Sequence, residues 1–319
     1  MADLADTQKE LASQKATGRF IKPSFIVATV LFIATLVAIA VPGAVTPKNS
    51  VPFYVAVVLI ECLFLWRYIA GGKKRSTANI ASAIFILLIG WEVAATDLKV
   101  THPVLVPIPE NVFAVFPNLY GELLRNVTSS MLLLCEGFVT SLIAATIIGL
   151  FVGWMPKLRE TVFPIAKVLA PIPAIVFTPY LVMLLHSFSA AAVMVIFLGI
   201  FWPTLMNTIL RVESLDKRII DSAKMMGLST PTMIFRVLLP YLYPTIVTGL
   251  KVQLPSAMLM LVMAEMYGAS SGLGYFVINY TNYGNYTNVV AGIIMVGVVV
   301  TILDGLVSLL IKKTVKWSE

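Results

Sequence analysis

The sequence predicts an all-α polytopic membrane protein with about eight transmembrane helices. The prediction depends on the composition, on the spacing of long apolar runs and on the uneven distribution of Lys and Arg. Of the 319 residues, 59% are hydrophobic and only 12% are charged, whereas charged residues make up about a quarter of an ordinary soluble domain. The lipid bilayer is therefore the expected environment of most of this chain.

Eight apolar runs are candidate spans, and each is close to or longer than the roughly 17–25 residues that a helix needs to cross the hydrocarbon core. They cover residues 25–41, 51–69, 80–96, 127–153, 162–185, 190–210, 237–262 and 288–311. Residues 1–24 are predicted to be a short cytoplasmic tail, and residues 25–79 a hairpin of two spans. The first run follows Asp3, Asp6 and Glu10 and is longer than a usual signal core, which favours a retained span over a cleaved signal peptide.

The distribution of Lys and Arg predicts the orientation. With a cytoplasmic N-terminus, only Lys48, Lys99 and Arg125 of the 23 Lys and Arg residues fall in outer segments, and only Lys167 and Lys251 fall within spans. Such an excess of basic residues on one side is typical of cytoplasmic loops, so both termini are predicted to be cytoplasmic. The formal net charge of +7 follows from this bias, and no nucleic-acid partner is expected.

The fifth run, 162–185, contains four prolines and is predicted to be bent. Pro164, Pro171, Pro173 and Pro179 each lack a backbone N–H. The carbonyl groups that they leave unpaired are tolerated at membrane depth only where protein or water satisfies them. Pro171 and Pro173 are therefore candidates for the wall of a translocation path, and the alternative is that the prolines only shape packing.

A polar interruption lies between the sixth and seventh runs, 190–210 and 237–262. In the sequence D-S-A-K-M-M-G-L-S-T-P-T-M-I-F-R-V-L-L-P, from Asp221 to Pro240, three small residues lie close enough on a helix for a partner's surface to approach the backbone. Asp221 is expected in the first turn of this helix, where the helix dipole favours a carboxylate, and Gly227 with the following Leu-Ser is expected to end it. The simpler alternative is a short amphipathic connector.

The spacing of this interruption resembles the cytoplasmic coupling loop of ABC importer permeases. The family pattern is E-A-A, three residues, Gly, nine residues, Ile, any residue, Leu-Pro, and every offset is reproduced here. The matching positions are Asp221, Ser222, Ala223, Gly227, Val237, Leu239 and Pro240, of which Asp221, Ser222 and Val237 are conservative departures. The resemblance implies that the loop 211–240 docks on a cytoplasmic ATPase.

Further segments are similar to the nitrate, sulfonate, taurine and bicarbonate type of binding-protein-dependent permease, over about residues 85–317. They are Trp91-Glu92, the run L-V-P-I-P-E-N-V from Leu105, P-I-P-A from Pro171, P-T-L-M-N-T from Pro203, and A-E-M-Y-G-A-S-S-G-L-G-Y from Ala264 to Tyr275. The resemblance implies a type I ABC importer permease fold, with a transmembrane domain of six spans over residues 80–319 and two extra N-terminal spans. It also implies a bacterial inner-membrane location, a cytoplasmic ATPase dimer, an external substrate-binding protein and a second permease copy as partners, and a small solute related to nitrate, sulfonate or taurine.

Five residues are candidates for the translocation path: Glu136, Pro171, Pro173, His186 and Glu265. A carboxylate in a spanning helix is costly toward lipid, so Glu136 is expected to face protein or water, either in the path or paired with Lys251. His186-Ser187 stands in a turn where the family commonly has glycine, and Glu265 lies where an outward cavity would open. The alternative for each acid is a structural hydrogen bond between helices.

No catalytic residue, cofactor or metal site is predicted. The sequence lacks the G-x-x-x-x-G-K-[ST] phosphate loop, and its two histidines and two cysteines form no metal-binding pattern. Cys62 and Cys135 lie in apolar runs and are expected to be packing residues. The rival functions are an ion-coupled secondary transporter that uses Glu136, Glu265 and Asp304 with Lys251, and a channel or structural scaffold. The coupling loop favours the ABC permease, because neither rival needs it.

Overall fold

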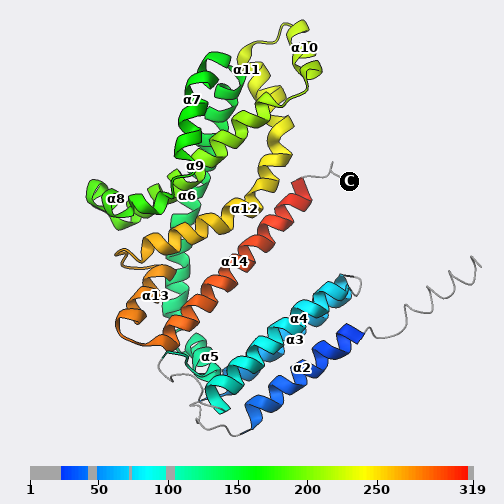
Figure 1. The fold of residues 1–319 in the computed structure, drawn as a ribbon, viewed down its shortest axis with the longest axis vertical. Coiled ribbons are helices and arrows are strands. Elements are labelled where there is room, and N and C mark those ends of the chain that lie inside the picture. The colour runs from blue at the N-terminus through cyan, green and yellow to red at the C-terminus, as the bar shows by residue number, and fades with distance from the viewer. Residues whose placement is uncertain (1–22, 42–48, 72–73, 98–104, 315–319) are drawn as a thin grey trace, which may run out of the picture. The chain divides into compact units, whose positions relative to one another are not determined.

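The computed structural model describes residues 23–41, 49–71, 74–97 and 105–314. All regular elements in these ranges are helices (Figure 1). Residues 1–22 of the predicted tail, the outer residues Lys48 and Lys99, and His102 lie outside the described ranges. The helices form two compact units, each of which is described by itself.

The first unit comprises residues 1–119 together with 286–291. It contains α2 (Pro23–Ala40), α3 (Val51–Ala70), α4 (Arg75–Glu92), the π-helical turn η1 (Val93–Asp97) and α5 (Pro109–Asn118). Buried aromatic side chains hold these helices together, with Phe53 of α3 stacked on Phe113 of α5 at a centroid distance of 5.0 Å. Trp91 of α4 donates a hydrogen bond from Nε1 to the carbonyl oxygen of Pro107 at 2.9 Å, which joins two of the sequence motifs noted above.

The second unit comprises residues 120–285 and 292–319. Its helices are α6 (Tyr120–Trp154), α7 (Pro156–Leu169), the 3₁₀ turn η2 (Ala174–Phe177), α8 (Thr178–Leu185), α9 (Phe188–Glu213), α10 (Lys217–Met225), α11 (Thr230–Met233), the π-helical turn η3 (Ile234–Leu238), α12 (Leu239–Glu265), α13 (Leu273–Asn282) and α14 (Tyr286–Thr314). Helix α13 lies between the predicted spans 237–262 and 288–311, where no helix is expected from the sequence.

Helices α6 and α9 form the central contact of the second unit, and their backbones approach closely. A Cβ added to Gly149 of α6 would lie 2.7 Å from Cβ of Thr208, and one added to Gly153 would lie 2.7 Å from Cβ of Val212. Glycine at these positions leaves room for the facing β-branched side chains, so the two helices pack as one rigid pair.

The predicted span 162–185 is a broken pair of helices and not a single helix. Seven described helices are long and apolar enough to cross a membrane by themselves, and α7 with the segment Ala174–Leu185 makes an eighth crossing only as a pair bent by 81°. Pro171 and Pro173 lie in the break, and Pro179 lies in the first turn of α8, where a missing N–H costs little. The bend predicted from the prolines is confirmed, and the continuous span is corrected.

Candidate functional site

The predicted coupling loop folds into a compact helical cap on the ends of longer helices. Ala223 of α10 and Met233 of α11 are buried in a cluster with Leu150 of α6, Val212 of α9 and Leu238 of η3. One apolar cluster therefore joins α10 to α6 and α9.

Helix α10 begins four residues before the position expected from the sequence. Its range is Lys217–Met225, so Asp221 lies in the middle of the helix, exposed, and not in the first turn. The N-terminal cap is Asp216, whose Oδ1 accepts a hydrogen bond from the backbone N–H of Arg218 at 2.9 Å. The Arg218 side chain also donates to both carboxylate oxygens of Asp216, and these bonds hold the pKa of Asp216 below its ordinary value.

Replacing Asp216 by alanine is expected to loosen the first turn of α10. The loss of an N-terminal cap leaves the first backbone N–H groups of the helix without an acceptor from the protein, so hydrogen exchange of the α10 amides should become faster. Because the pKa of Asp216 is lowered in the folded protein, the cap is fully formed above the ordinary pKa of aspartate and is lost as the pH falls through the lowered value. Unchanged exchange rates in the variant near neutral pH would show that the cap does not stabilise α10.

The predicted coupling residues do not all face the same way. Asp221, Ser222 and Gly227 are exposed, whereas Ala223 is buried against the chain's own cluster. Gly227 adopts φ +67°, which ends α10 as predicted, and a Cβ there would meet no other atom within 4 Å. Val237 and Leu239 pack against the cluster, and Pro240 is exposed in the first turn of α12. The motif thus has exposed residues that a partner can contact and buried residues that pack against the chain's own helices.

Two methionines at the tip of α10 were missed by the sequence analysis. Met225 is 90% exposed and Met226 is 69% exposed. Flexible, polarisable methionine side chains are frequent on surfaces that bind other proteins. The sequence does contain an indication of this exposed apolar tip, because both methionines lie between the small residues of the motif in a segment that is otherwise polar.

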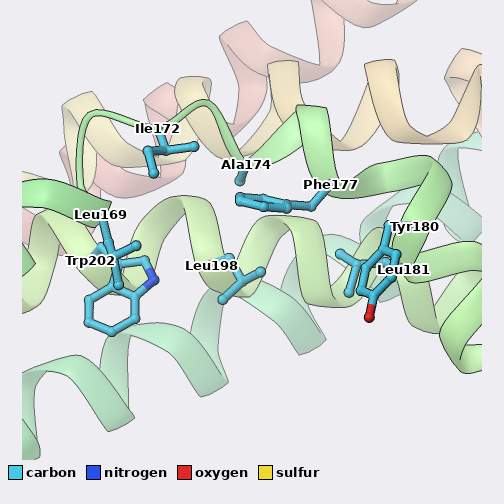
Figure 2. Close-up of a pocket in the computed structure, with 8 residues that line it drawn as sticks. All are labelled: Leu169, Ile172, Ala174, Phe177, Tyr180, Leu181, Leu198 and Trp202. Carbon is cyan, nitrogen blue, oxygen red and sulfur yellow. The ribbon is translucent and has the colours of Figure 1, made fainter. Parts of the chain in front are cut away.

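The break between α7 and α8 forms an apolar pocket of about 290 Å³. Figure 2 shows Ile172, Ala174 and Phe177 on the connecting segment and Leu198 and Trp202 on α9. Pro171 and Pro173 flank Ile172 in this segment but are not among the residues that line the pocket. They shape the backbone that carries the lining residues, and their role in a translocation path stays a prediction.

A second pocket, of about 380 Å³, contains Glu136. Its carboxylate is exposed on α6, and the expected pairing with Lys251 is not formed: the ion pairs among the described residues are Arg159 with Glu213 and Arg218 with Asp216. His186 lies directly after the lining residue Leu185 and is exposed. Its φ of +53° is left-handed, which agrees with the prediction of a turn that favours glycine.

Glu265 is fully buried, with 0% of its surface exposed, at the end of α12. Its Oε1 accepts a hydrogen bond from the Ser130 hydroxyl at 2.6 Å, and its Oε2 accepts one from the backbone N–H of Gly274 at 2.7 Å. Ser130 accepts from the N–H of Leu273, and Asn126 Oδ1 accepts from the N–H of Gly272. In this structure Glu265 therefore joins α6, α12 and the start of α13, and it does not line an open cavity.

Glycines around Glu265 make this network possible. Gly272 has φ +123°, and a Cβ there would lie 2.3 Å from the Glu265 carboxylate carbon. The motif residues noted from Ala264 to Tyr275 thus have a shared physical role, because the carboxylate needs close approach of backbone N–H groups.

Among the described residues no group of three or more His, Cys, Asp or Glu side chains is placed to hold a metal ion. Cys62 and Cys135 are free and exposed on this chain, so the expectation that they are packing residues is corrected.

A model of the family described as "Binding-protein-dependent transport system inner membrane component" matches residues 141–316, which include the coupling loop and the pocket between α7 and α8. Leu133 and Glu136 of the other pocket precede the matched residues. The chain belongs to this family. The putative aliphatic sulfonates transport permease protein SsuC of Bacillus subtilis is 28% identical over 251 residues, covering 77% of this chain and 90% of the relative. The nitrate import permease protein NrtB of Leptolyngbya laminosa is 27% identical, covering 77% and 91%.

The taurine transport system permease protein TauC of Escherichia coli is 25% identical, covering 73% of this chain and 86% of the relative. A solved structure of the MetNI methionine ABC transporter in inward-facing conformations matches 63% of this chain and 97% of the other, with 18% identity and a TM-score of 0.49.

Family membership confirms the predicted fold class, a type I ABC importer permease, and the predicted function as a permease subunit of an ABC import system. The alternative of a secondary transporter is not favoured. Components of this family are generally non-catalytic membrane subunits with several spans.

Proposed function

We propose that this permease subunit is driven by a cytoplasmic ABC ATPase dimer that binds the exposed face of α10. The observation that carries the proposal is the two-sided geometry of the coupling loop: Ser222, Met225 and Gly227 are exposed, while Ala223 is anchored in the cluster that contains Leu150. The exposed face of α10 carries no side chain at Gly227, so a groove on a partner protein can fit closely against it. The buried Ala223 would pass a movement of that partner to the helices that it packs against. ATP binding would bring two such helices together and change the access of the path.

The remaining parts of the assembly follow from this proposal. A second copy of the chain completes the translocation path, and an external binding protein delivers a small solute. The relatives are named for sulfonates, nitrate and taurine, and we propose a related small solute for this chain. Spans α2 and α3 are proposed to be additional to the transport domain 80–319, because the segments that resemble the permease family begin only at Trp91-Glu92.

The docking proposal is tested at Gly227. Tryptophan at this position adds bulk to the exposed face and is strained by the positive φ of the backbone there, so the Gly227→Trp variant is expected to lose about tenfold or more of the ATPase that co-purifies with wild type. Gly227→Asn is the matched control, because asparagine tolerates a left-handed backbone and is small. Equal recovery of the ATPase with Gly227→Trp and with wild type would exclude this face as the docking site.

The proposed orientation places both termini and α10 in the cytoplasm of a bacterial cell, with the chain in the inner membrane. A green fluorescent protein fused after residue 319 should therefore fluoresce, and alkaline phosphatase inserted at the exposed turn of Gly284 should be active, since each reporter works on only one side of the membrane. The reverse pattern would contradict the orientation and with it access of the ATPase to α10.

A further inference from the structure

The pocket around Glu136 combines one carboxylate with an otherwise apolar wall. Leu133 and Glu136 come from α6, Leu185 from the end of α8, and the remaining lining from α9: Ser189, Ala190, Val193, Met194 and Phe197. The Ser189 hydroxyl is the second polar side-chain group, and no basic side chain lines the pocket. Its volume of about 380 Å³ is in the range of sites for small organic molecules.

The carboxylate of Glu136 has no countercharge within the described part of the chain. Arg159 with Glu213 and Arg218 with Asp216 are the ion pairs there, and both lie away from this pocket. Glu136 is the seventeenth of the 35 residues of α6, so it lies near the middle of a spanning helix. A charged side chain at that depth costs about 2.5–3.5 kcal/mol on insertion scales unless it faces water or a partner.

The lining also restricts what kind of partner fits. An anionic group would be repelled by Glu136 and would find no basic residue in the pocket. A positively charged N–H group would form a charge-assisted hydrogen bond with the carboxylate, and the aliphatic and aromatic wall formed by Leu133, Val193 and Phe197 would accept an apolar body.

We propose that the Glu136 pocket is a contact point of the translocation path and that it takes a small organic solute carrying a positively charged amine or amidine. This inference builds on the proposed importer function and narrows its solute class. Among the solutes named for the relatives, taurine carries such an amine beside its sulfonate, whereas nitrate and simple sulfonates do not. The solute of this importer is therefore a cation or a zwitterion.

The test measures the charge preference of the pocket and does not require the natural solute. Ser189 is replaced by cysteine in a background without Cys62 and Cys135, because both native cysteines are exposed. The permease with its ATPase, in lipid nanodiscs, is treated with two methanethiosulfonate reagents of similar size, one bearing a trimethylammonium group and one a sulfonate group. The same thiolate attacks the sulfur of either reagent and displaces methanesulfinate to form a mixed disulfide, so any change in the thiolate fraction cancels in the ratio of the two rates.

In the protein with Glu136, the ratio of the cationic to the anionic rate is expected to be at least about tenfold higher than in the Glu136→Gln variant, because one nearby charge acts on the two reagents with opposite sign. Asp304→Asn is the matched control, since Asp304 is an exposed acid in a spanning helix outside this pocket. That variant is expected to leave the ratio unchanged.

Three results would overturn the proposal. Failure of both reagents to modify Ser189→Cys would mean that lipid or a second copy of the chain covers the pocket. An equal ratio with glutamate and with glutamine would mean that Glu136 does not set its charge preference. Loss of association between two permease copies in Glu136→Gln would make this residue a subunit contact. Recovery of the ATPase in the same preparation reports separately on the proposed function.

Discussion

Replacement of Glu265 by alanine is expected to lower the melting temperature of the purified permease by about 5–10 °C. The change leaves the N–H of Gly274 and the hydroxyl of Ser130 buried without their acceptor, and it opens a cavity next to Gly272. Buried donors that lose a charged acceptor cost about 1–3 kcal/mol each, and about 2–4 °C per kcal/mol is expected for a domain of this size. Fluorescence-detected size-exclusion chromatography after heating measures the shift.

Glutamine is the informative control at this position. Glu265→Gln keeps a carbonyl oxygen that accepts from Gly274 and an amide that donates to the Ser130 oxygen, so its melting temperature should lie between those of wild type and the alanine variant. If Glu265→Ala melts within about 2 °C of wild type, the network does not hold α13 on α6 and α12, and the residue is then available for the path role expected from the sequence.

Replacement of Met225 by aspartate is expected to abolish stable binding of the ATPase while leaving the permease folded. Met225 is 90% exposed, so the substitution breaks no packing within the chain. In the complex, an unpaired carboxylate would be buried in a groove that accepts an apolar tip, which costs several kcal/mol. Co-purification of the ATPase should fall by more than about a hundredfold.

Two variants separate docking from general effects of charge. Met225→Leu keeps an apolar side chain at the tip of α10 and should retain the ATPase. Lys313→Asp makes the net charge more negative at the end of α14, outside the coupling loop, and should also retain the ATPase. Normal recovery of the ATPase with Met225→Asp would place the contact on another part of the loop.

The spans were predictable from the sequence because length and hydrophobicity are sufficient to recognise them. Long runs such as 127–153 and 288–311 became α6 and α14, each with additional polar turns at the ends. The break at residues 170–173 could not be located in the same way. Four prolines predict a bend, but the position of the turn also depends on tertiary packing, such as that of Ala174 and Leu181 in one cluster with α9 residues.

Within the coupling loop, the sequence predicted the position of the motif but not the direction of its side chains. The motif predicts Asp221 in a first turn, but α10 begins earlier because Asp216 caps it. The spacing predicts Ala223 on the face with Ser222 and Gly227, but the cluster around Leu150 buries it. The direction in which each side chain points depends on tertiary contacts with α6 and α9. The spacing of residues along the sequence does not reveal these contacts.

The candidate acids of the translocation path can be chosen from the sequence only by their position within a predicted span. That position does not distinguish an acid buried in a structural hydrogen-bond network from one that faces a pocket. Glu136 and Glu265 look equivalent in a hydrophobic profile. The structure distinguishes them through Gly272 and Gly274, whose backbone approaches Glu265 and supplies a partner for its carboxylate, whereas Glu136 faces a pocket.

The most direct test of the account is ATP hydrolysis by this chain purified with an ABC ATPase from the same cell and reconstituted in nanodiscs. We expect a stable complex in which the rate of hydrolysis differs from that of the ATPase alone, and we expect this difference to disappear in Met225→Asp. If the wild-type chain neither binds the ATPase nor alters its rate of hydrolysis, the proposed coupling through α10 is contradicted.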